Sequence, residues 1–549
     1  MTSSPIPKPH KPPGLYLRVG DIPKWPSILL FGFQQTMLVL SGLLVVPFLV
    51  ADVACAGNAA TELRVQLMAA TFFVSGIATL LQTTIGLRLS IMHGPSFAFL
   101  PPLLAYKALP EMRCKADENT FVPREEWQAR VATIQGSLLL GVLPMLIIGA
   151  TGLVGKFAKY VGPITIAPLL LLLTLGNVPT LEEKLALHWV SIVEFLILMT
   201  LMIFLDEICV PVPYYSFVEK RIKWNRPRIF GLFPYLIGIG LAWFICIMMT
   251  VTGLEKEEGQ ARVDKNASMT VLRDAPWFQV PLPGAFGPLR INWGLTLGFV
   301  ASAVACTMES IGEYTVCARI SEERHPPCSA TNRAILCEGL GATLAALMGV
   351  GVGVTTYGEN VALMAVTKVA SRITMQTAGI FLVIIGLLTK CAAVLASIPE
   401  PIVGGVLGMG MVMVCGVGIS NLQTVDLRLS RNLSIIGLSV VVGVTVPLHF
   451  EQHPVNFGNY TVDNILNMLL TIRMLIGGLV AFLMDNIVGG ATKAQRGFPV
   501  EEKNDENEYT RDGYSFPMWF ERFLMRWPLL QKIPFLPKLT ADVPPAYKV

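Results

Sequence analysis

Acidic side chains interrupt two otherwise apolar stretches of this chain. Glu309 and Glu313 stand four positions apart, so a helix would place both carboxylates on one face. Glu359 lies 50 positions after the first of these acids and is followed directly by Asn360. Burying an acid in hydrocarbon costs about 3 kcal/mol or more, and an acid at that depth is by default a candidate for function. We therefore expect the two stretches to face each other across a substrate pocket.

These carboxylates could accept hydrogen bonds or bind cations. Glu309 and Glu359 can accept two N–H bonds from the edge of a planar ligand, and charge-assisted bonds are about twice as strong as neutral ones. Glu309 and Glu313 cannot both ionise cheaply in a low dielectric. A sodium ion bound at Glu313, or a proton on it, would relieve the repulsion. The alternative for Glu309 and Glu359 is a structural role, in which they pair with Lys368 or with backbone N–H groups.

The composition places these acids in a membrane. Of the 549 residues, 53% are hydrophobic and only 15% are charged, against about 25% in ordinary soluble domains. Because a span needs about 20 apolar residues, the apolar stretches predict an all-α polytopic membrane protein with fourteen transmembrane segments. The basic residues cluster beside apolar spans rather than on one face, which argues against nucleic-acid binding. The six histidines form no metal cluster or nucleophile–base pair, which argues against an enzyme.

Charge bias predicts the orientation of the chain. Lys and Arg crowd the loops around 220–228, 319–333 and 428–431, which we therefore expect on the cytosolic side with both termini. The glycosylation acceptors Asn266 and Asn459 then fall outside the cell. Cys55 and Cys114 also fall in outer loops, where a disulfide can form. The predicted parts are a disordered N-terminal tail (1–26), a seven-span repeat (27–252), an extracellular loop (253–291), a second seven-span repeat (292–488) and a cytosolic C-terminal tail (489–549).

The third span of each predicted repeat is broken. The first repeat has Gly94–Pro102, rich in glycine and proline, and the second has the stretch that begins at Gly358. Broken segments at matching positions of two halves indicate an inverted repeat with a binding site near the bilayer midplane. Non-helical backbone survives at that depth only where protein or a water-filled cavity satisfies its polar groups. We expect short extended pieces in spans 3 and 10.

With these motifs in view, the sequence resembles the nucleobase–ascorbate transporter family over residues 32–485. The family signature is Gln/Glu/Pro-Asn-x-Gly, four further residues, then Thr-Arg/Lys. This chain has Glu359 and Asn360, then Ala362 in place of the usual glycine, and, after four intervening residues, Thr367 and Lys368. In the first span Gln34 matches a family glutamine, and Gln35 replaces the histidine that usually follows it.

The resemblance implies a fold and a mechanism. Spans 1–4 and 8–11 would form a core domain that holds substrate, and spans 5–7 and 12–14 a gate domain that commonly also dimerises, so a homodimer is expected. Transport would resemble an elevator movement of core against gate in the plasma membrane. No cofactor is expected. The animal branch favours sodium as the coupling ion, with Glu313 where that branch usually has Asp, and Thr367 is a further candidate for the ion site.

The first signature residue discriminates best between substrates. Animal ascorbate transporters carry proline there and nucleobase transporters carry Glu or Gln, so Glu359 favours nucleobase uptake. Ascorbate remains the alternative, and a substrate sensor with the same fold is a second one. Phe97 rather than Phe99 is expected to stack on the ligand ring. The expected substrate-binding residues are Glu309, Glu359, Asn360, Phe97, Ala98, Ser96, Gly358 and Gln34.

Overall fold

The computed structural model describes residues 14–109, 112, 114, 120–216, 221–226, 228–256, 259–498, 513–527 and 530–537. The first 13 positions of the predicted N-terminal tail therefore lie outside the described residues. So do positions 499–512 and 538–549 of the predicted C-terminal tail. Lys220, one of the basic residues that predict the orientation, also lies outside.

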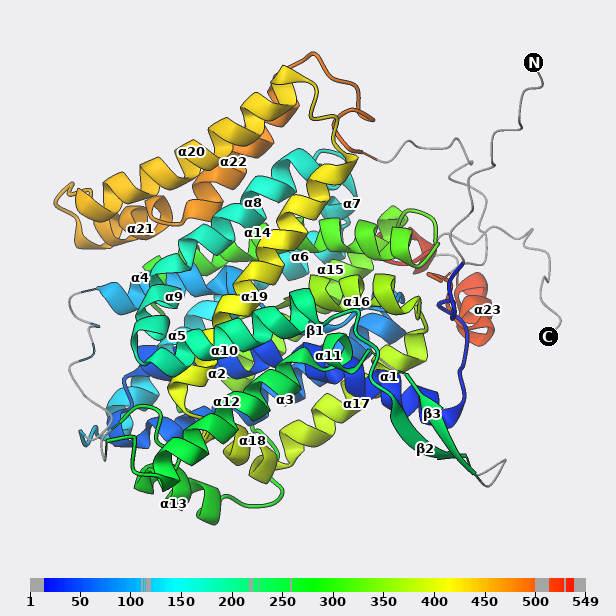
Figure 1. Ribbon diagram of the computed structural model, residues 1–549. Helices are drawn as coiled ribbons and strands as arrows, with labels where there is room; N and C mark the ends of the chain where they lie inside the picture. The colour runs from blue at the N-terminus through cyan, green and yellow to red at the C-terminus, as the bar shows by residue number, and fades with distance from the viewer. Residues whose placement is uncertain are drawn as a thin grey trace, which may run out of the picture.

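The described residues form a helical protein whose long helices run broadly alongside one another (Figure 1). A first group of helices is drawn from the beginning and the middle of the chain. It contains α1 (Trp25–Leu38), α2 (Leu40–Ala54), α3 (Ala60–Thr84), α4 (Leu100–Ala108), α5 (Arg124–Gly141), α6 (Leu143–Thr151), α7 (Leu153–Phe157), α14 (Trp293–Ile320), α15 (Cys328–Met348), α16 (Gly358–Thr367), α17 (Arg372–Leu387) and α18 (Thr389–Ala396).

A second group is likewise assembled from two separated parts of the chain. It contains α8 (Pro163–Gly176), α9 (Val178–Ala186), α10 (Trp189–Met199), α11 (Ile229–Leu232), α12 (Pro234–Val251), α19 (Glu400–Asn421), α20 (Ser430–Gln452) and α22 (Arg473–Ile487). Within it α19 packs on α8 and α10, and α22 packs on α8 and α20. The remaining helices are α13 (Asn266–Asp274), which packs on α3 and α18, α21 (Tyr460–Leu470), which packs on α14, and α23 (Met518–Arg526).

Glycines set the closest approach in the first group. A Cβ on Gly76 of α3 would stand 2.6 Å from the carbonyl oxygen of Gly379 in α17. A Cβ on Gly386, two turns further along α17, would stand 2.5 Å from the backbone nitrogen of Phe73. Small residues let membrane helices pack backbone to backbone. The glycines therefore account for the tight contact between α3 and α17.

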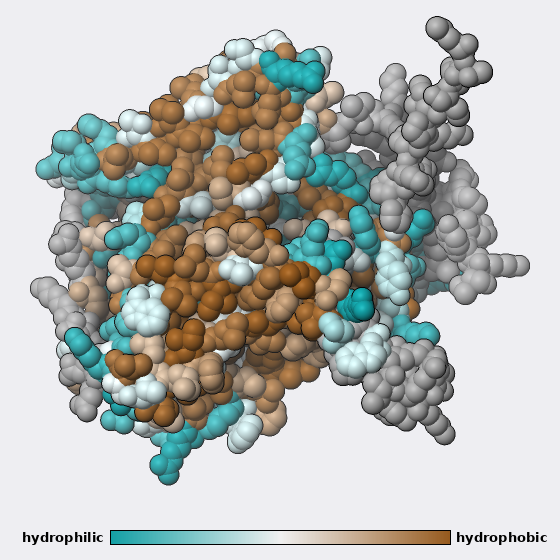
Figure 2. Space-filling view, in the orientation of Figure 1, coloured by the Kyte–Doolittle hydropathy of each residue, from teal (hydrophilic) through white to brown (hydrophobic). Residues whose placement is uncertain are grey.

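In the part of the chain that the structure describes, eight helices are long and apolar enough to cross a membrane, or ten if two bent helix pairs each count as one span. The bent pairs are 372–387 with 389–396, and 462–470 with 473–487; a shorter apolar helix covers 189–204. Figure 2 shows a broad hydrophobic surface over the middle of one face, with hydrophilic residues at its left and right margins. The chain is thus a multi-pass membrane protein, as the composition predicts.

Two short strands lie inside the first group where the broken spans are predicted. Strand β1 (His93–Pro95) pairs antiparallel with β4 (Val354–Thr356), with Gly94 opposite Thr355. β1 leads through a single 3₁₀ turn into α4, and β4 leads into α16. Because the strands are antiparallel, the two helices leave the pair in opposite directions. A second strand pair, β2 (Val212–Ser216) with β3 (Arg221–Asn225), occupies the predicted basic loop and is a feature that the all-α prediction missed.

The segment before α1 is ordered along the first group, so the prediction of a disordered tail is wrong for this part. The backbone N–H groups of Tyr16 and Leu17 donate to the carbonyl oxygen of Lys368. The N–H of Arg372 donates to the carbonyl oxygen of Val19 at 3.1 Å. The backbone of the tail thus supplies partners to the exposed polar groups between α16 and α17. Sequence composition cannot show such pairing because it depends on backbone rather than side chains.

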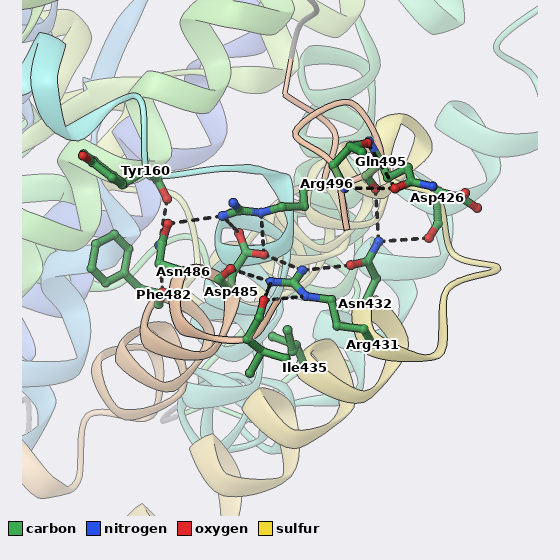
Figure 3. A network of polar contacts seen from close by, with 12 residues as sticks. Tyr160, Asp426, Arg431, Asn432, Ile435, Phe482, Asp485, Asn486, Gln495 and Arg496 are labelled. Atoms are coloured by element: carbon green, nitrogen blue, oxygen red, sulfur yellow. Dashed lines mark hydrogen bonds and ion pairs between the residues drawn. The ribbon is translucent and has the colours of Figure 1, made fainter. Parts of the chain in front are cut away.

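The chain after α22 is held to the second group by a polar network (Figure 3). The carboxylate of Asp485 is fully buried and accepts bonds from Arg431 at 2.8 Å and from Arg496 at 2.7 and 2.9 Å. Asn432 donates to the carbonyl oxygen of Gln495 at 3.1 Å. The network ties residues 495–496 to the beginning of α20 and the end of α22.

Candidate functional site

A cavity lies between the two helix groups, next to the paired strands. The first group contributes the end of β1, the face of α14 and the junction of β4 with α16; the second group contributes apolar residues of α8 and α19. The lining residues are Pro95, Phe97, Leu170, Leu173, Glu309, Glu313, Thr355, Thr356, Tyr357, Gly358, Glu359, Val414 and Val417.

Three acids of the prediction, Glu309, Glu313 and Glu359, line this one cavity. Glu313 and Glu359 are buried, and Glu309 carries a buried oxygen, Oε2, that has no hydrogen-bond partner within the described part of the chain. No ion pair to any of the three occurs among the residues that the structure describes, so the alternative pairing with Lys368 is not seen. Like charges this close cannot all ionise without a compensating cation or proton. The site therefore has unused capacity for hydrogen-bond donors and positive charge.

Gly358 is the point at which α14 and α16 meet. A Cβ there would stand 2.7 Å from Oε1 of Glu313 and 3.1 Å from its Cδ. The absence of a side chain lets the Glu313 carboxyl lie at the N-terminus of α16, where backbone N–H groups and the helix dipole favour negative charge. Gly94 of β1 likewise makes room for a neighbour, because a Cβ there would stand 2.5 Å from the ring of Tyr357.

The two candidate aromatics, Phe97 and Phe99, lie in different surroundings. Phe97 lines the cavity, whereas Phe99 packs against Phe299 with ring centroids 6.0 Å apart. A Cβ on Gly353 would stand 2.7 Å from the Phe99 ring, which shows how closely that ring is enclosed. Phe97 thus offers a ring to a ligand, and Phe99 belongs to the packed interior.

Five residues of the predicted site do not line the cavity. Asn360 donates to the carbonyl oxygen of Gln35 at 3.1 Å and to its Oε1 at 2.5 Å, and so fixes α16 to α1. Ser96 Oγ accepts a bond from the N–H of Ala98 at 3.2 Å and forms the turn after β1. Thr367 bonds within α16, to the carbonyl oxygen of Leu363. The other two of the five are Ala98, the donor to Ser96, and Gln34. Gln34 is buried, and its Nε2 has no partner among the described residues.

A buried carboxyl supports the site from behind. Glu338 of α15 accepts bonds from Ser310 Oγ and Tyr314 Oη, both at 2.7 Å. Ser310 Oγ also lies 3.3 Å from Oγ1 of Thr355, which lines the cavity. Gln82 donates to Tyr314 Oη at 3.1 Å. This network fixes the face of α14 that presents Glu309 and Glu313.

Some lining residues carry no signal that a single sequence reveals. Leu170, Leu173, Val414 and Val417 look like any other apolar residue of a span, and only the packing of α8 and α19 turns them toward the cavity. Thr355 and Thr356 lie within the stretch that the sequence singles out, but their place in a strand beside the cavity becomes visible only in the structure.

Four charges join the two groups at one end of the molecule. Asp52 and Arg64 come from the first group, and Lys184 and Glu400 from the second. Lys184 pairs with both Asp52 and Glu400, and Arg64 Nη2 lies 3.0 Å from Glu400 and 3.4 Å from Asp52. We call these four residues the charge ring. Its members come from four separate elements, so a single sequence does not reveal it.

Other features predicted for the outer side are the disulfide and the glycosylation acceptors. Cys55, three residues after Asp52, forms a disulfide with Cys114 across a Cα–Cα distance of 5.5 Å. Asn266 and Asn459, the predicted glycosylation acceptors, are both exposed. Among the residues that the structure describes, no group of three or more His, Cys, Asp or Glu is arranged to hold a metal ion.

Comparison with known proteins gives a consistent set of matches. Residues 26–452 match the Permease family. The chain is 34% identical over 499 residues to Solute carrier family 23 member 2 of Rattus norvegicus, covering 88% of this chain and 76% of that protein. It is 32% identical over 568 residues to Solute carrier family 23 member 1 of Mus musculus, covering 99% and 93%.

More distant matches extend the set. Nucleobase-ascorbate transporter 12 of Arabidopsis thaliana is 28% identical over 571 residues, covering 93% of this chain and 76% of that protein. Among solved structures, the transmembrane domain of a cyanobacterium bicarbonate transporter, BicA, superposes with a TM-score of 0.45 at 12% identity, covering 86% of this chain and 100% of that one.

Proposed function

Because this chain belongs to the nucleobase–ascorbate transporter family, whose members are membrane transporters rather than enzymes, we propose that it imports nucleobases together with a cation, and that the cation is sodium. The observation that carries the substrate proposal is the presence of two acceptor carboxyls, Glu309 and Glu359, with the ring of Phe97 in one cavity. A nucleobase presents N–H donors on the edge of a flat ring. The carboxyls can accept those donors while Phe97 stacks on the face of the ring.

The cation has an electrostatic reason. Glu313 adds a third carboxyl to the cavity wall, and no cationic side chain pairs with these acids among the described residues. A sodium ion bound at Glu313 would compensate negative charge in the cluster. Binding of the ion and binding of a neutral base would then depend on each other. Thr367 lies at the far end of α16 and bonds within that helix, which argues for Glu313 as the centre of the ion site. A proton on Glu313 is the alternative.

The position of the cavity supports an elevator movement. One wall belongs to the first group and the other to the second, so sliding of one group along the other would carry bound ligand with Glu309 and Glu359. We propose that the first group is the core domain and the second the gate. We also propose that α15, the shorter α10 and the two strand-broken segments complete fourteen spans in two inverted repeats.

The wider setting of the transporter follows from the same assignment. We propose that it is a homodimer formed through the gate domains and resides in the plasma membrane. Both termini would be cytosolic, and the end with the disulfide would face outward. Asn266 and Asn459, both exposed, would carry glycans on that outer side.

Ascorbate is the second candidate substrate, because the plant relatives bear the name nucleobase-ascorbate transporter. Thr355 and Thr356 place hydroxyls in the cavity wall that suit a ligand with several hydroxyl groups. Ascorbate is an anion near neutral pH, however, and three facing carboxyls would repel it unless cations intervened. A sensor that binds but does not carry substrate is a third reading.

Uptake into cells tests the proposal directly. Labelled uracil, xanthine and ascorbate are supplied with external sodium or with choline in its place, and we expect base uptake that requires sodium. Glu309→Gln should abolish this uptake while leaving the protein at the cell surface. Glu126→Gln, an exposed acid of α5, is the matched control and should transport normally. Normal uptake by Glu309→Gln would contradict the assignment of Glu309 to the substrate site. Uptake that follows an inward pH gradient would move coupling to protons.

A further inference from the structure

The C-terminal helix α23 exposes an aromatic stripe. Trp519 and Phe523 are 71% and 46% exposed and stand four residues apart, so they share one side of the helix, and Trp527, 57% exposed, follows directly after its last residue. Arg526 is exposed beside them. Leu524 is fully buried on the opposite side, together with Glu521. The aromatic stripe thus lies on the side of the helix that faces away from the protein.

The chain before α23 is fastened to the first helix group by three arginines from three separate elements. Arg88 donates to the carbonyl oxygen of Ser515 at 2.9 Å, Arg333 to that of Tyr514 at 3.5 Å, and Arg372 to that of Gly513 at 2.5 Å. The Phe516 ring that follows lies under the guanidinium groups of Arg88 and Arg333, at 5.1 and 4.4 Å. Cation–π contacts of this kind strengthen when desolvated. The beginning of α23 is therefore fixed in place rather than loosely attached.

The place of α23 in the molecule narrows what can cover its stripe. Figure 1 places the helix at the end of the molecule at which α1 begins. Trp25, the first residue of α1, is exposed, as is Tyr16 in the segment before it. Tryptophan and tyrosine gather at the boundary between lipid tails and water. Residue Arg372 joins the two segments, because its N–H donates to Val19 and its guanidinium to Gly513.

From this arrangement we propose that α23 lies on the headgroup region of the bilayer, with Trp519, Phe523 and Trp527 inserted among anionic lipids. The occupant is a lipid surface because aromatics alternate with arginine, the composition of helices that lie in a membrane interface. The cytosolic leaflet is negatively charged, and it attracts basic residues near its surface. Through its three arginine bonds the helix would keep the first group in contact with the leaflet. The inference uses the membrane placement of the family and the proposed orientation, and it is independent of the substrate.

Photo-crosslinking in the full-length protein tests this contact. Benzoylphenylalanine replaces Phe523, and the protein is reconstituted into liposomes of phosphatidylcholine with phosphatidylserine, without substrate. After irradiation we expect lipid adducts on the peptide that contains α23, detected by mass spectrometry. The matched control places the same probe at Leu524, whose buried side should give adducts within the chain instead. Because no transport is measured, failure here leaves the proposed function untouched.

A second variant tests the charge. In the protein with the probe at position 523, Arg526→Glu should lower the yield of lipid adducts about fivefold in liposomes with phosphatidylserine, and leave it unchanged in pure phosphatidylcholine. Adducts between two copies of the chain would assign the stripe to a protein interface and overturn the proposal. Absence of any lipid adduct at position 523 would overturn it equally.

Discussion

The carboxyl of Glu313 lies against Gly358, at a place where any side chain would displace it. This contact joins the middle of α14 to the first residue of α16, two elements 45 positions apart in sequence. The acid therefore stands at a helix N-terminus that belongs to another segment, and the glycine is what makes room for it. Several expected outcomes depend on contacts of this kind.

Gly358→Ala should weaken the response to the coupling cation. The added Cβ would meet Glu313 Oε1 at 2.7 Å, so the carboxyl must move away from the cavity wall. We expect the sodium concentration for half-maximal uptake to rise about tenfold, which corresponds to about 1.4 kcal/mol. Gly240→Ala in α12 is the control, since a Cβ there meets nothing within 4 Å. An unchanged sodium dependence would show that Glu313 does not hold the ion.

Phe97→Leu and Phe99→Leu should differ in kind. Phe97 lines the cavity, so its loss should raise the KM for substrate several-fold with little change in the amount of folded protein. Phe99 packs against Phe299, so its loss should cost about 1–3 kcal/mol of stability and lower the thermal transition of the purified protein. Measured KM and melting curves for both variants separate the two roles. Equal effects on KM would contradict the assignment of Phe97.

Lys184→Met should disrupt the charge ring strongly, because the Lys184 side chain is buried. It leaves Asp52 and Glu400 with one cation between them, and removing one partner of a buried pair costs about 3–5 kcal/mol. Adding Glu400→Met restores the balance of charges, so the double variant should recover part of the lost melting temperature and uptake. The double-mutant cycle measures this coupling. Simple addition of the two losses would mean that the ring does not act as a unit.

Asp485→Asn should be far more damaging than Glu451→Gln, although both break ion pairs to arginine on the same two helices. Asp485 is fully buried between Arg431 and Arg496, and its loss leaves two guanidinium groups without a carboxylate. We expect a loss of about 3–5 kcal/mol. In the ion pair between Glu451 and Arg473 the Glu451 side chain is 40% exposed, so this pair should contribute less than about 1 kcal/mol to stability. Thermal stability in detergent compares the two, and similar losses would disprove the role of burial.

The parts of the site that sequence predicts are those that are exceptional for a membrane span. Glu309, Glu313 and Glu359 are expensive in hydrocarbon, and Gly94 with its neighbouring prolines breaks a helix, so their types alone mark them. Asn360 is equally exceptional, but its amide is used to hold Gln35 rather than to line the cavity. A polar residue at depth can satisfy a neighbouring helix or a ligand, and one sequence does not distinguish the two.

The features that sequence misses depend on backbone or on long-range packing. The β2–β3 pair and the ordered segment at Tyr16 are made of main-chain bonds. The charge ring gathers ordinary charged residues from span ends, each of which would be unremarkable at a membrane surface. The fourteen predicted spans stay a prediction, because helices such as α10 are shorter than the bilayer's usual requirement and the strand-broken segments resemble no single span.

The Cys55–Cys114 disulfide has a consequence for motion that depends on which parts it joins. It closes a loop that begins after α2 and encloses α3, β1 and α4, all within the first helix group. The charge ring beside it, in contrast, links the two groups by ionic contacts alone. Among the described residues, the only covalent cross-link therefore lies within one group, while the charge ring that crosses between the groups is ionic. Under the proposed elevator movement, oxidation of the two cysteines would strengthen the first group without locking it to the second.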